Sequence, residues 1–258
     1  MRGAGRWSRA TAGAVVAGCD VLAWRLRGQA ARVAVRSGGA VAVLGIARGA
    51  GLSWTELGLG RAELKRGFVF GMAAGACAAA AMCAAVALPA TRGLFLDERA
   101  AAASPGRLPA ELARITFAAV PPEELTYRSA LLGLAVASAP VASTTVAGAP
   151  VASAPVAGAS VASAVAWSSL LFGLSHIPPT LATMSKTAMH GHIADRPLRT
   201  GAFVAGNVAV TGLAGAVFAW LRLRSGSVVA PLIAHAAVND AALAAARAAH
   251  ELAAASRR

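Results

Sequence analysis

One uncharged stretch of the chain is long enough to cross a lipid bilayer. Residues 68–90 read FVFGMAAGACAAAAMCAAVALPA, and none of these 23 residues carries a charge. A helix needs about 20 consecutive apolar residues to span the hydrocarbon core of a membrane. Inside that core the chain must satisfy its own backbone polar groups, which leaves helices and closed barrels as the only spanning structures. The stretch therefore predicts a transmembrane helix.

Further apolar runs predict that this helix belongs to a bundle. Apolar residues make up 57% of the chain and charged residues 14%, against about a quarter charged in an ordinary soluble domain. Two more long runs lie at residues 201–221 and 227–252, and shorter runs lie at residues 10–24 and 38–52. We expect one integral membrane domain over residues 1–258, an all-α polytopic membrane helix bundle of about six to eight helices with a polar site inside the bundle.

Basic residues flank these runs and account for the formal net charge of +13. We assign four of them to one loop and two to the end of the run at 201–221: Arg25, Arg27, Arg32 and Arg36, then Arg222 and Arg224. Basic loops favour the cytoplasmic side of a membrane and its anionic lipids. Because the arginines are divided among loops instead of forming one stripe with aromatics, we expect membrane lipid as a partner and no nucleic acid.

The N-terminal run contains a sequence similar to a processing signal. Three arginines precede it, and residues 16–19 (VAGC) resemble a bacterial lipoprotein cleavage box. However, the apolar stretch before Cys19 is short and apolar residues resume at Val21, which favours a retained helix over cleavage. Cys19, Cys77 and Cys83 support neither a disulfide framework nor a zinc site built from cysteine pairs.

A five-residue repeat interrupts the middle of the chain. Six related pentads such as APVAS fill residues 134–163, and three of them contain proline. A period of five fits neither a helix nor a strand, and proline removes a backbone hydrogen-bond donor. We expect residues 139–160 to form a flexible or extended loop that tolerates shortening, and the next helix to begin near Val161.

The first polar fragment joins two prolines to two carboxylates. Pro121 and Pro122 precede Glu123 and Glu124, an order that is typical of the first turn of a helix. A plain helix start is therefore one interpretation. Glu124 and Arg128 are four residues apart and can pair on one helix face. Glu123 then points about 100° away around the helix and is free for another role.

Two histidine fragments follow. Phe172 precedes His176 by one turn, and the Pro-Pro pair after Ile177 predicts that the helix ends close to this imidazole. His235 and Asn239 are also one turn apart, so their polar groups lie on a common helix face. Taken alone, each fragment also fits a structural role, as a satisfied histidine or as a hydrogen bond between helices.

Together, the fragments bring one carboxylate, two imidazoles and one amide from three expected helices. Ionisable groups are costly in hydrocarbon, so their presence in membrane segments points to function. A carboxylate can activate water, a histidine can orient it, and a second histidine with an amide can stabilise an oxyanion. The same groups can instead hold a metal ion with an open water position. The H-E-x-x-H and G-x-S-x-G motifs are both absent.

In their order and spacing, E-E-x-x-x-R, F-x-x-x-H and H-x-x-x-N resemble the CPBP family of CAAX proteases and bacteriocin-processing (Abi) proteins, which includes the type II CAAX prenyl endopeptidases. Residues 51–59 (GLSWTELGL) are similar to a segment that such proteins often carry before their second membrane helix. The resemblance covers residues 49–242 and excludes the pentad repeats.

The resemblance implies a role for each matching residue. Glu123 would be the catalytic glutamate that activates water, and His176 would help to position that water. His235 and Asn239 would form the pair that stabilises the oxyanion. No motif residue is missing from the chain, so we expect an intact site.

The resemblance also implies supporting residues and leaves the cofactor open. Glu124, Arg128 and Phe172 would be structural supports. The family has been described both as metalloproteases and as glutamate-dependent proteases. A divalent metal such as zinc would be held by Glu123 and by the two motif histidines, His176 and His235. We favour the glutamate mechanism without a metal cofactor.

The function implied by the resemblance is that of an intramembrane endopeptidase acting on a membrane-proximal peptide or protein. The alanine- and arginine-rich composition is typical of a GC-rich bacterium, so we expect a multi-pass protein of a bacterial plasma membrane and a substrate such as a bacteriocin-type leader. The alternative is a non-catalytic immunity or scaffold protein of the same fold that binds a peptide or partner. A small transporter would need hydropathy repeats, which the sequence lacks.

Overall fold

Long helices dominate the described part of the chain. The computed structural model describes residues 4–96, 106, 108–138, 143–146, 149–152, 154–184 and 197–255. In chain order, its main elements are α1 (Ala4–Arg25), α2 (Gln29–Gly49), α3 (Leu64–Ala87), α4 (Pro89–Arg92), η1 (Gly93–Phe95), α6 (Leu108–Arg114), η3 (Ile115–Ala119), α7 (Val120–Glu124), η4 (Leu125–Leu131), α8 (Leu132–Ala137), β1 (Ser143–Val146), β2 (Ala149–Ala152), α9 (Ala154–Leu174), α10 (Ile177–Met184), α12 (Pro197–Ser225) and α13 (Val229–Ala255).

Within these ranges, five helical segments are long and apolar enough to span a membrane. They are Gln29–Gly49, Leu64–Ala87, Ser160–Ala182, Thr200–Ser225 and Val229–Ala255. Three of them overlap the long apolar runs of the sequence, at residues 68–90, 201–221 and 227–252. The protein is therefore a multi-pass, all-α membrane helix bundle, as its sequence predicts.

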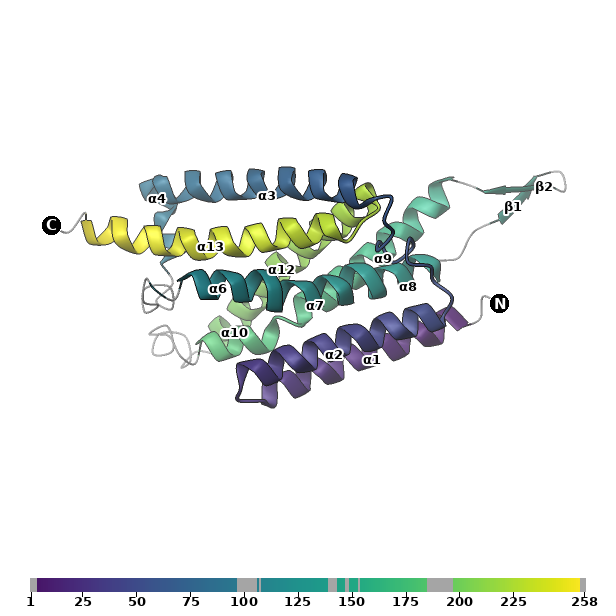
Figure 1. Ribbon diagram of the computed structural model, residues 1–258, viewed down its shortest axis with the longest axis horizontal. Coiled ribbons are helices and arrows are strands. Elements are labelled where there is room, and N and C mark those ends of the chain that lie inside the picture. Colours follow the sequence, from purple (N-terminus) through teal and green to yellow (C-terminus); the bar gives the residue numbers. More distant parts are fainter. Residues whose placement is uncertain are drawn as a thin grey trace.

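Three helix pairs pack around one segmented helix (Figure 1). The pairs are α1 with α2, α3 with α13, and α9 with α12. The segmented helix runs over residues 108–137 and consists of α6, η3, α7, η4 and α8. It touches α2 on one side and α13 on the other. Residues of the N-terminal hairpin and of the C-terminal helix can therefore meet at its middle.

A stripe of small residues lets α3 approach α13 closely. Gly67, Gly71 and Gly75 are buried and follow one another at intervals of four residues. A Cβ atom on Gly71 would lie 2.8 Å from the Ala230 carbonyl oxygen and 2.9 Å from Cβ of Ile233. Because helix association in lipid depends on close packing of small residues, this stripe explains why α3 and α13 form a pair.

The two prolines of the first polar fragment lie inside the segmented helix. Pro121 and Pro122 belong to α7, which is preceded by the π-helical segment η3 and followed by a second one, η4. The prolines therefore lie in the first turn of α7, but α7 continues a run of helical segments that begins at Leu108 instead of starting a separate helix. A proline cannot donate its backbone hydrogen bond and collides with the carbonyl four residues earlier. The widened turn before α7 gives the helix a way to accommodate both defects.

Two other sequence expectations also differ from the structure. Arg32 and Arg36 belong to α2 instead of the preceding loop, which is reduced to residues 26–28. Within the repeat, β1 and β2 form an antiparallel hairpin in which Ser143 pairs with Ala152. Helix α9 begins at Ala154, earlier than the expected Val161, because Pro155 fits the first turn of a helix. The remaining residues of the predicted loop, 139–142, 147–148 and 153, lie outside the described residues.

We expect Gly71→Ala to destabilise the bundle and Gly45→Ala to leave it unchanged or slightly more stable. The new methyl group of Gly71→Ala would meet α13 backbone, which costs about 1–3 kcal/mol, whereas a Cβ on Gly45 has no neighbour within 4 Å. Alanine also has the higher helix propensity at both positions. Thermal unfolding in detergent measures the difference. Equal melting temperatures would show that the stripe does not hold α3 on α13.

Deleting residues 143–152, which hold both strands of the repeat, should leave the bundle folded. The two strands pair with each other in a two-stranded sheet, and shortening a flexible connection changes its closure entropy by only about 0.6 kcal/mol per twofold change in length. Thermal unfolding and size-exclusion elution of the shortened protein in detergent test this expectation. A large drop in melting temperature would mean that the hairpin supports the helices.

Candidate active site

Glu124 is a completely buried carboxylate shared by two partners. It lies at the end of α7 and is 0% exposed. Its Oε1 accepts a hydrogen bond from Nη1 of Arg128 at 3.0 Å and one from Nδ1 of His235 at 2.7 Å. The pairing with Arg128 is the one that the four-residue spacing predicts. The contact with His235 ties the segmented helix to α13.

The hydrogen bond from His235 fixes which nitrogen of its ring faces Glu123. A carboxylate only accepts hydrogen bonds, so Nδ1 must carry the proton that is donated to Glu124. The other nitrogen, Nε2, lies 3.9 Å from Oε2 of Glu123. The ring stacks on Phe218 of α12, with 4.8 Å between ring centroids and 23° between the planes. His235 is therefore held from two sides with Nε2 directed at Glu123.

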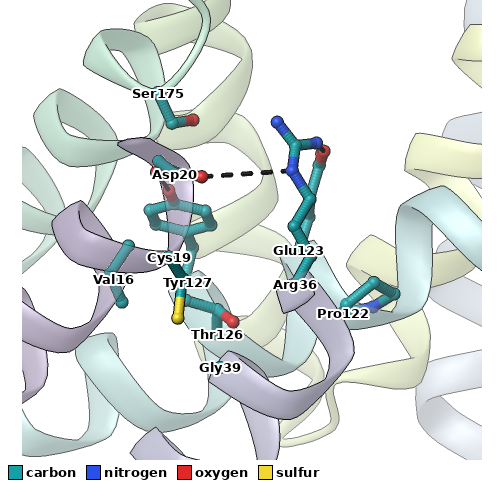
Figure 2. A pocket seen from close by; sticks show the side chains of 10 residues that line it. All are labelled: Val16, Cys19, Asp20, Arg36, Gly39, Pro122, Glu123, Thr126, Tyr127 and Ser175. Atoms are coloured by element: carbon teal, nitrogen blue, oxygen red, sulfur yellow. Dashed lines mark hydrogen bonds and ion pairs between the residues drawn. The ribbon is translucent and has the colours of Figure 1, made fainter. Parts of the chain in front are cut away.

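Glu123 has a more open environment than its neighbour. Its side chain is 17% exposed, and Oε1 accepts a hydrogen bond from Nη1 of Arg36 at 3.0 Å. The residue lines a small pocket of about 20 Å³, which has room for one water molecule. Figure 2 shows this pocket between the N-terminal hairpin and the segmented helix, with the side chains of Arg36, Asp20, Tyr127 and Ser175 on its walls. Of the two glutamates, Glu123 is the one that lines the pocket.

Phe172 lies between the two imidazoles of the histidine motifs. His176 follows the end of α9, and its Nδ1 lies 2.7 Å from the carbonyl oxygen of Phe172, to which it donates. The Phe172 ring centroid is 4.6 Å from that of His176 and 5.8 Å from that of His235. The guanidinium carbon of Arg128 lies 3.8 Å from the same ring centroid. Phe172 therefore acts as a common packing surface for both histidines and the buried arginine.

Asn239 makes no described contact with this cluster. It is half-buried on α13, one turn beyond His235, and its side chain has no hydrogen-bond partner among the residues that the structure describes. The next residue, Asp240, accepts a hydrogen bond from the Thr116 hydroxyl at 2.8 Å. The structure thus brings Glu123, Glu124, Arg128 and His235 together and places His176 on the shared Phe172, whereas no described contact joins Asn239 to them.

The described His, Cys, Asp and Glu side chains form no group of three ligands for a metal ion. Both motif histidines have Nδ1 engaged, His235 with Glu124 and His176 with a backbone carbonyl, an arrangement that is also usual for histidines that bind a metal through Nε2. Arg36 and Arg128 also place positive charge on the two carboxylates, which opposes a second cation there.

Sequence reasoning missed two charged residues of the pocket. Asp20 and Arg36 come from α1 and α2, and Asp20 accepts a hydrogen bond from the Tyr127 hydroxyl at 3.2 Å. One signal was available, because Asp20 interrupts an apolar run and a membrane-embedded carboxylate is a default pointer to function. Arg36 carried no such signal, since a basic residue near the start of an apolar run is ordinarily a flanking charge.

The fold and the cluster define an α-helical membrane protein whose buried charges come from helices far apart in sequence. Residues 105–240, slightly more than half of the chain, match the family described as type II CAAX prenyl endopeptidase Rce1-like. The chain belongs to this family of membrane proteases. Neither the curated proteins nor the solved structures contain a match. The matched region holds all three motif fragments, while α1, α2 and α3 lie outside it.

We expect Arg128→Ala to destabilise the protein strongly and Arg114→Ala to have little effect. Removing Arg128 leaves the Glu124 carboxylate buried without its cation, and breaking a buried ion pair costs about 3–5 kcal/mol. Arg114 pairs with Glu111 in the same segmented helix, but both side chains are partly exposed, and such pairs contribute about 0–1 kcal/mol. Thermal unfolding in detergent compares the two variants. Similar losses would contradict the buried character of the Arg128 pair.

Proposed function

We propose that the protein is an intramembrane endopeptidase that hydrolyses a peptide bond in a membrane-proximal peptide or protein. Membership of the Rce1-like family supports this activity. The observation that carries the proposal is the facing pair of Glu123 Oε2 and His235 Nε2, 3.9 Å apart. Both atoms are held in place by further contacts, since Arg36 binds the other oxygen of Glu123 and Glu124 binds the other nitrogen of His235.

The proposed step begins with a water molecule bound between Glu123 and His235. A separation of 3.9 Å exceeds a direct hydrogen bond, and a water lying to one side can bond to both atoms. Glu123 takes a proton from this water, and the resulting hydroxide forms a bond to the carbonyl carbon of the peptide. Glu123 then passes the proton to the leaving nitrogen as the C–N bond breaks. One carboxylate thus acts first as base and then as acid.

Hydrogen-bond donors must stabilise the oxyanion that forms on the carbonyl oxygen. The Asn239 amide is the first candidate, because it has no partner among the described residues. His235 can assist only as the imidazolium ion, since its Nδ1 proton is already donated to Glu124 and a neutral Nε2 accepts. For His176, whose Nδ1 is also engaged, Nε2 is the nitrogen that can reach water. These roles are proposals for Asn239, His235 and His176.

The pocket at Glu123 has room for the attacking water, and we place the peptide substrate beside it, between the segmented helix and the N-terminal hairpin. Its walls combine apolar side chains with Asp20, Arg36 and Ser175. A bacteriocin-type leader or another short segment at the membrane surface is the substrate class we propose, with a bacterial plasma membrane as the location. Surrounding lipid would then hold both enzyme and substrate at the same depth.

A non-catalytic immunity or scaffold function of the same fold has one specific observation in its favour. The 3.0 Å contact with Arg36 engages one oxygen of the proposed base. A carboxylate neutralised in this way can serve binding without catalysis. We favour the protease because the second oxygen of Glu123 stays directed at His235.

Cleavage of a peptide library by the detergent-purified protein tests the proposal. We expect Glu123→Gln and His235→Ala to reduce kcat by about 100- to 10,000-fold, the range contributed by general acid–base catalysis. Glu111→Gln, a carboxylate outside the cluster, should keep wild-type cleavage, and a chelator should have no effect. Peptide binding without cleavage would instead support the scaffold, and loss of cleavage with chelator would support a metal.

A further inference from the structure

The N-terminal hairpin contributes a charged network to the Glu123 side of the site. Helices α1 and α2 lie outside the region that matches the family. They nevertheless supply half of the residues that line the pocket in Figure 2: Val16, Cys19, Asp20, Arg36 and Gly39. Two of these carry charge, and both are directed toward the middle of the segmented helix.

Arg36 spans two carboxylates from different helices. Its Nη1 lies 3.0 Å from Oε1 of Glu123, and its Nε lies 4.0 Å from Oδ1 of Asp20. Oδ2 of Asp20 accepts a hydrogen bond from the Tyr127 hydroxyl at 3.2 Å. A guanidinium group has donors in a fixed planar fork and can address both acids at once, which the single ammonium of lysine does less well. The network therefore sets the position of Arg36 from two sides.

The same network orients the carboxylate of Glu123. Because Arg36 holds Oε1, the second oxygen is the one that faces His235. The cation also offsets the repulsion between Glu123 and the neighbouring carboxylates of Glu124 and Asp20. The side chains of Arg36 and Glu123 are 32% and 17% exposed, so their attraction is screened by solvent and adds little stability. Its effect is on geometry.

We propose that Arg36 is a positioning residue that keeps Glu123 directed at His235, and that Asp20 and Tyr127 hold Arg36 in place. This inference rests on the proposed function. It assigns part of the active site to the N-terminal hairpin. Arg36 does not touch the reacting atoms in this scheme and acts through Glu123.

Steady-state cleavage by the full-length variants provides the first test. Arg36→Gln should lower kcat by about 10- to 100-fold, the scale expected for a misplaced catalytic group, with a KM within about threefold of wild type. Arg36→Lys should recover part of the loss. Asp20→Asn should also lower kcat, and its combination with Arg36→Gln should be no worse than Arg36→Gln alone. Arg32→Gln is the matched control, because Arg32 lies one turn earlier in α2 and donates to the Leu26 carbonyl. A raised KM with unchanged kcat would make Arg36 a substrate-binding residue and overturn the proposal.

A chemical label gives a second readout that needs no cleavage. Hydrophobic carbodiimides modify carboxyl groups that they can reach, so Glu123, whose Oε1 is covered by Arg36, should react slowly. Mass spectrometry should find labelling of Glu123 several-fold faster in Arg36→Gln, intermediate in Arg36→Lys and unchanged in Arg32→Gln. Equal labelling in wild type and Arg36→Gln overturns the positioning role. If the wild type cleaves no peptide, the proposed function fails, while the labelling rates still decide whether Arg36 controls Glu123.

Discussion

The buried carboxylate of Glu124 is the constraint on which the arrangement of the cluster depends. A charge that is completely removed from solvent must find compensating charge and hydrogen bonds within the protein. Glu124 obtains them from Arg128 in its own helix and from His235 in α13. Satisfying this one group therefore sets the rotation of α13 relative to the segmented helix. It also decides which nitrogen of His235 faces the pocket.

Adjacent positions in a helix allow two glutamates to have different environments. Consecutive residues point about 100° apart, so Glu124 faces the centre of the bundle while Glu123 lines the pocket beside the N-terminal hairpin. Their junction lies between two π-helical segments. Such segments often occur at functional sites, because an extra residue in one turn redirects the side chains that follow. The two π-helical segments thus occur at the place where Glu123 and Glu124 point into different environments.

The parts of this structure that follow from local chemistry could be predicted from the sequence. Long uncharged runs fix the membrane helices, and a four-residue spacing is sufficient to pair Glu124 with Arg128. The Pro-Pro pair after Ile177 correctly marks the end of α9 near His176. The prolines before Glu123 lie in the first turn of α7, but the sequence did not show that a π-helical segment precedes them directly, because proline at a free helix start and proline after a π-helical turn look alike in sequence.

Contacts between distant segments were beyond reach of sequence patterns. Arg36 and Glu123 are separated by 87 positions, and neither helix contains a spacing that indicates the other. Asn239 shows the same limit within a motif. Its spacing from His235 places it on the same helix face, but the spacing does not tell whether Asn239 contacts Glu123 or Glu124. Motif spacing constrains residues within one helix, whereas the packing of helices decides which motifs meet.

The charges of the cluster explain why helices α1 and α2 contribute charged residues beside Glu123. Arg128 lies on the face of Glu124 and is buried against Phe172, so it cannot also bond to a neighbour that points about 100° away. The Glu123 carboxylate then needs a cation from another helix or hydrogen bonds from water. Arg36 meets this need from α2, and Asp20 balances Arg36 in turn. The two adjacent glutamates of the segmented helix thus pair with two separate cations, Arg128 in the same helix and Arg36 supplied by tertiary packing.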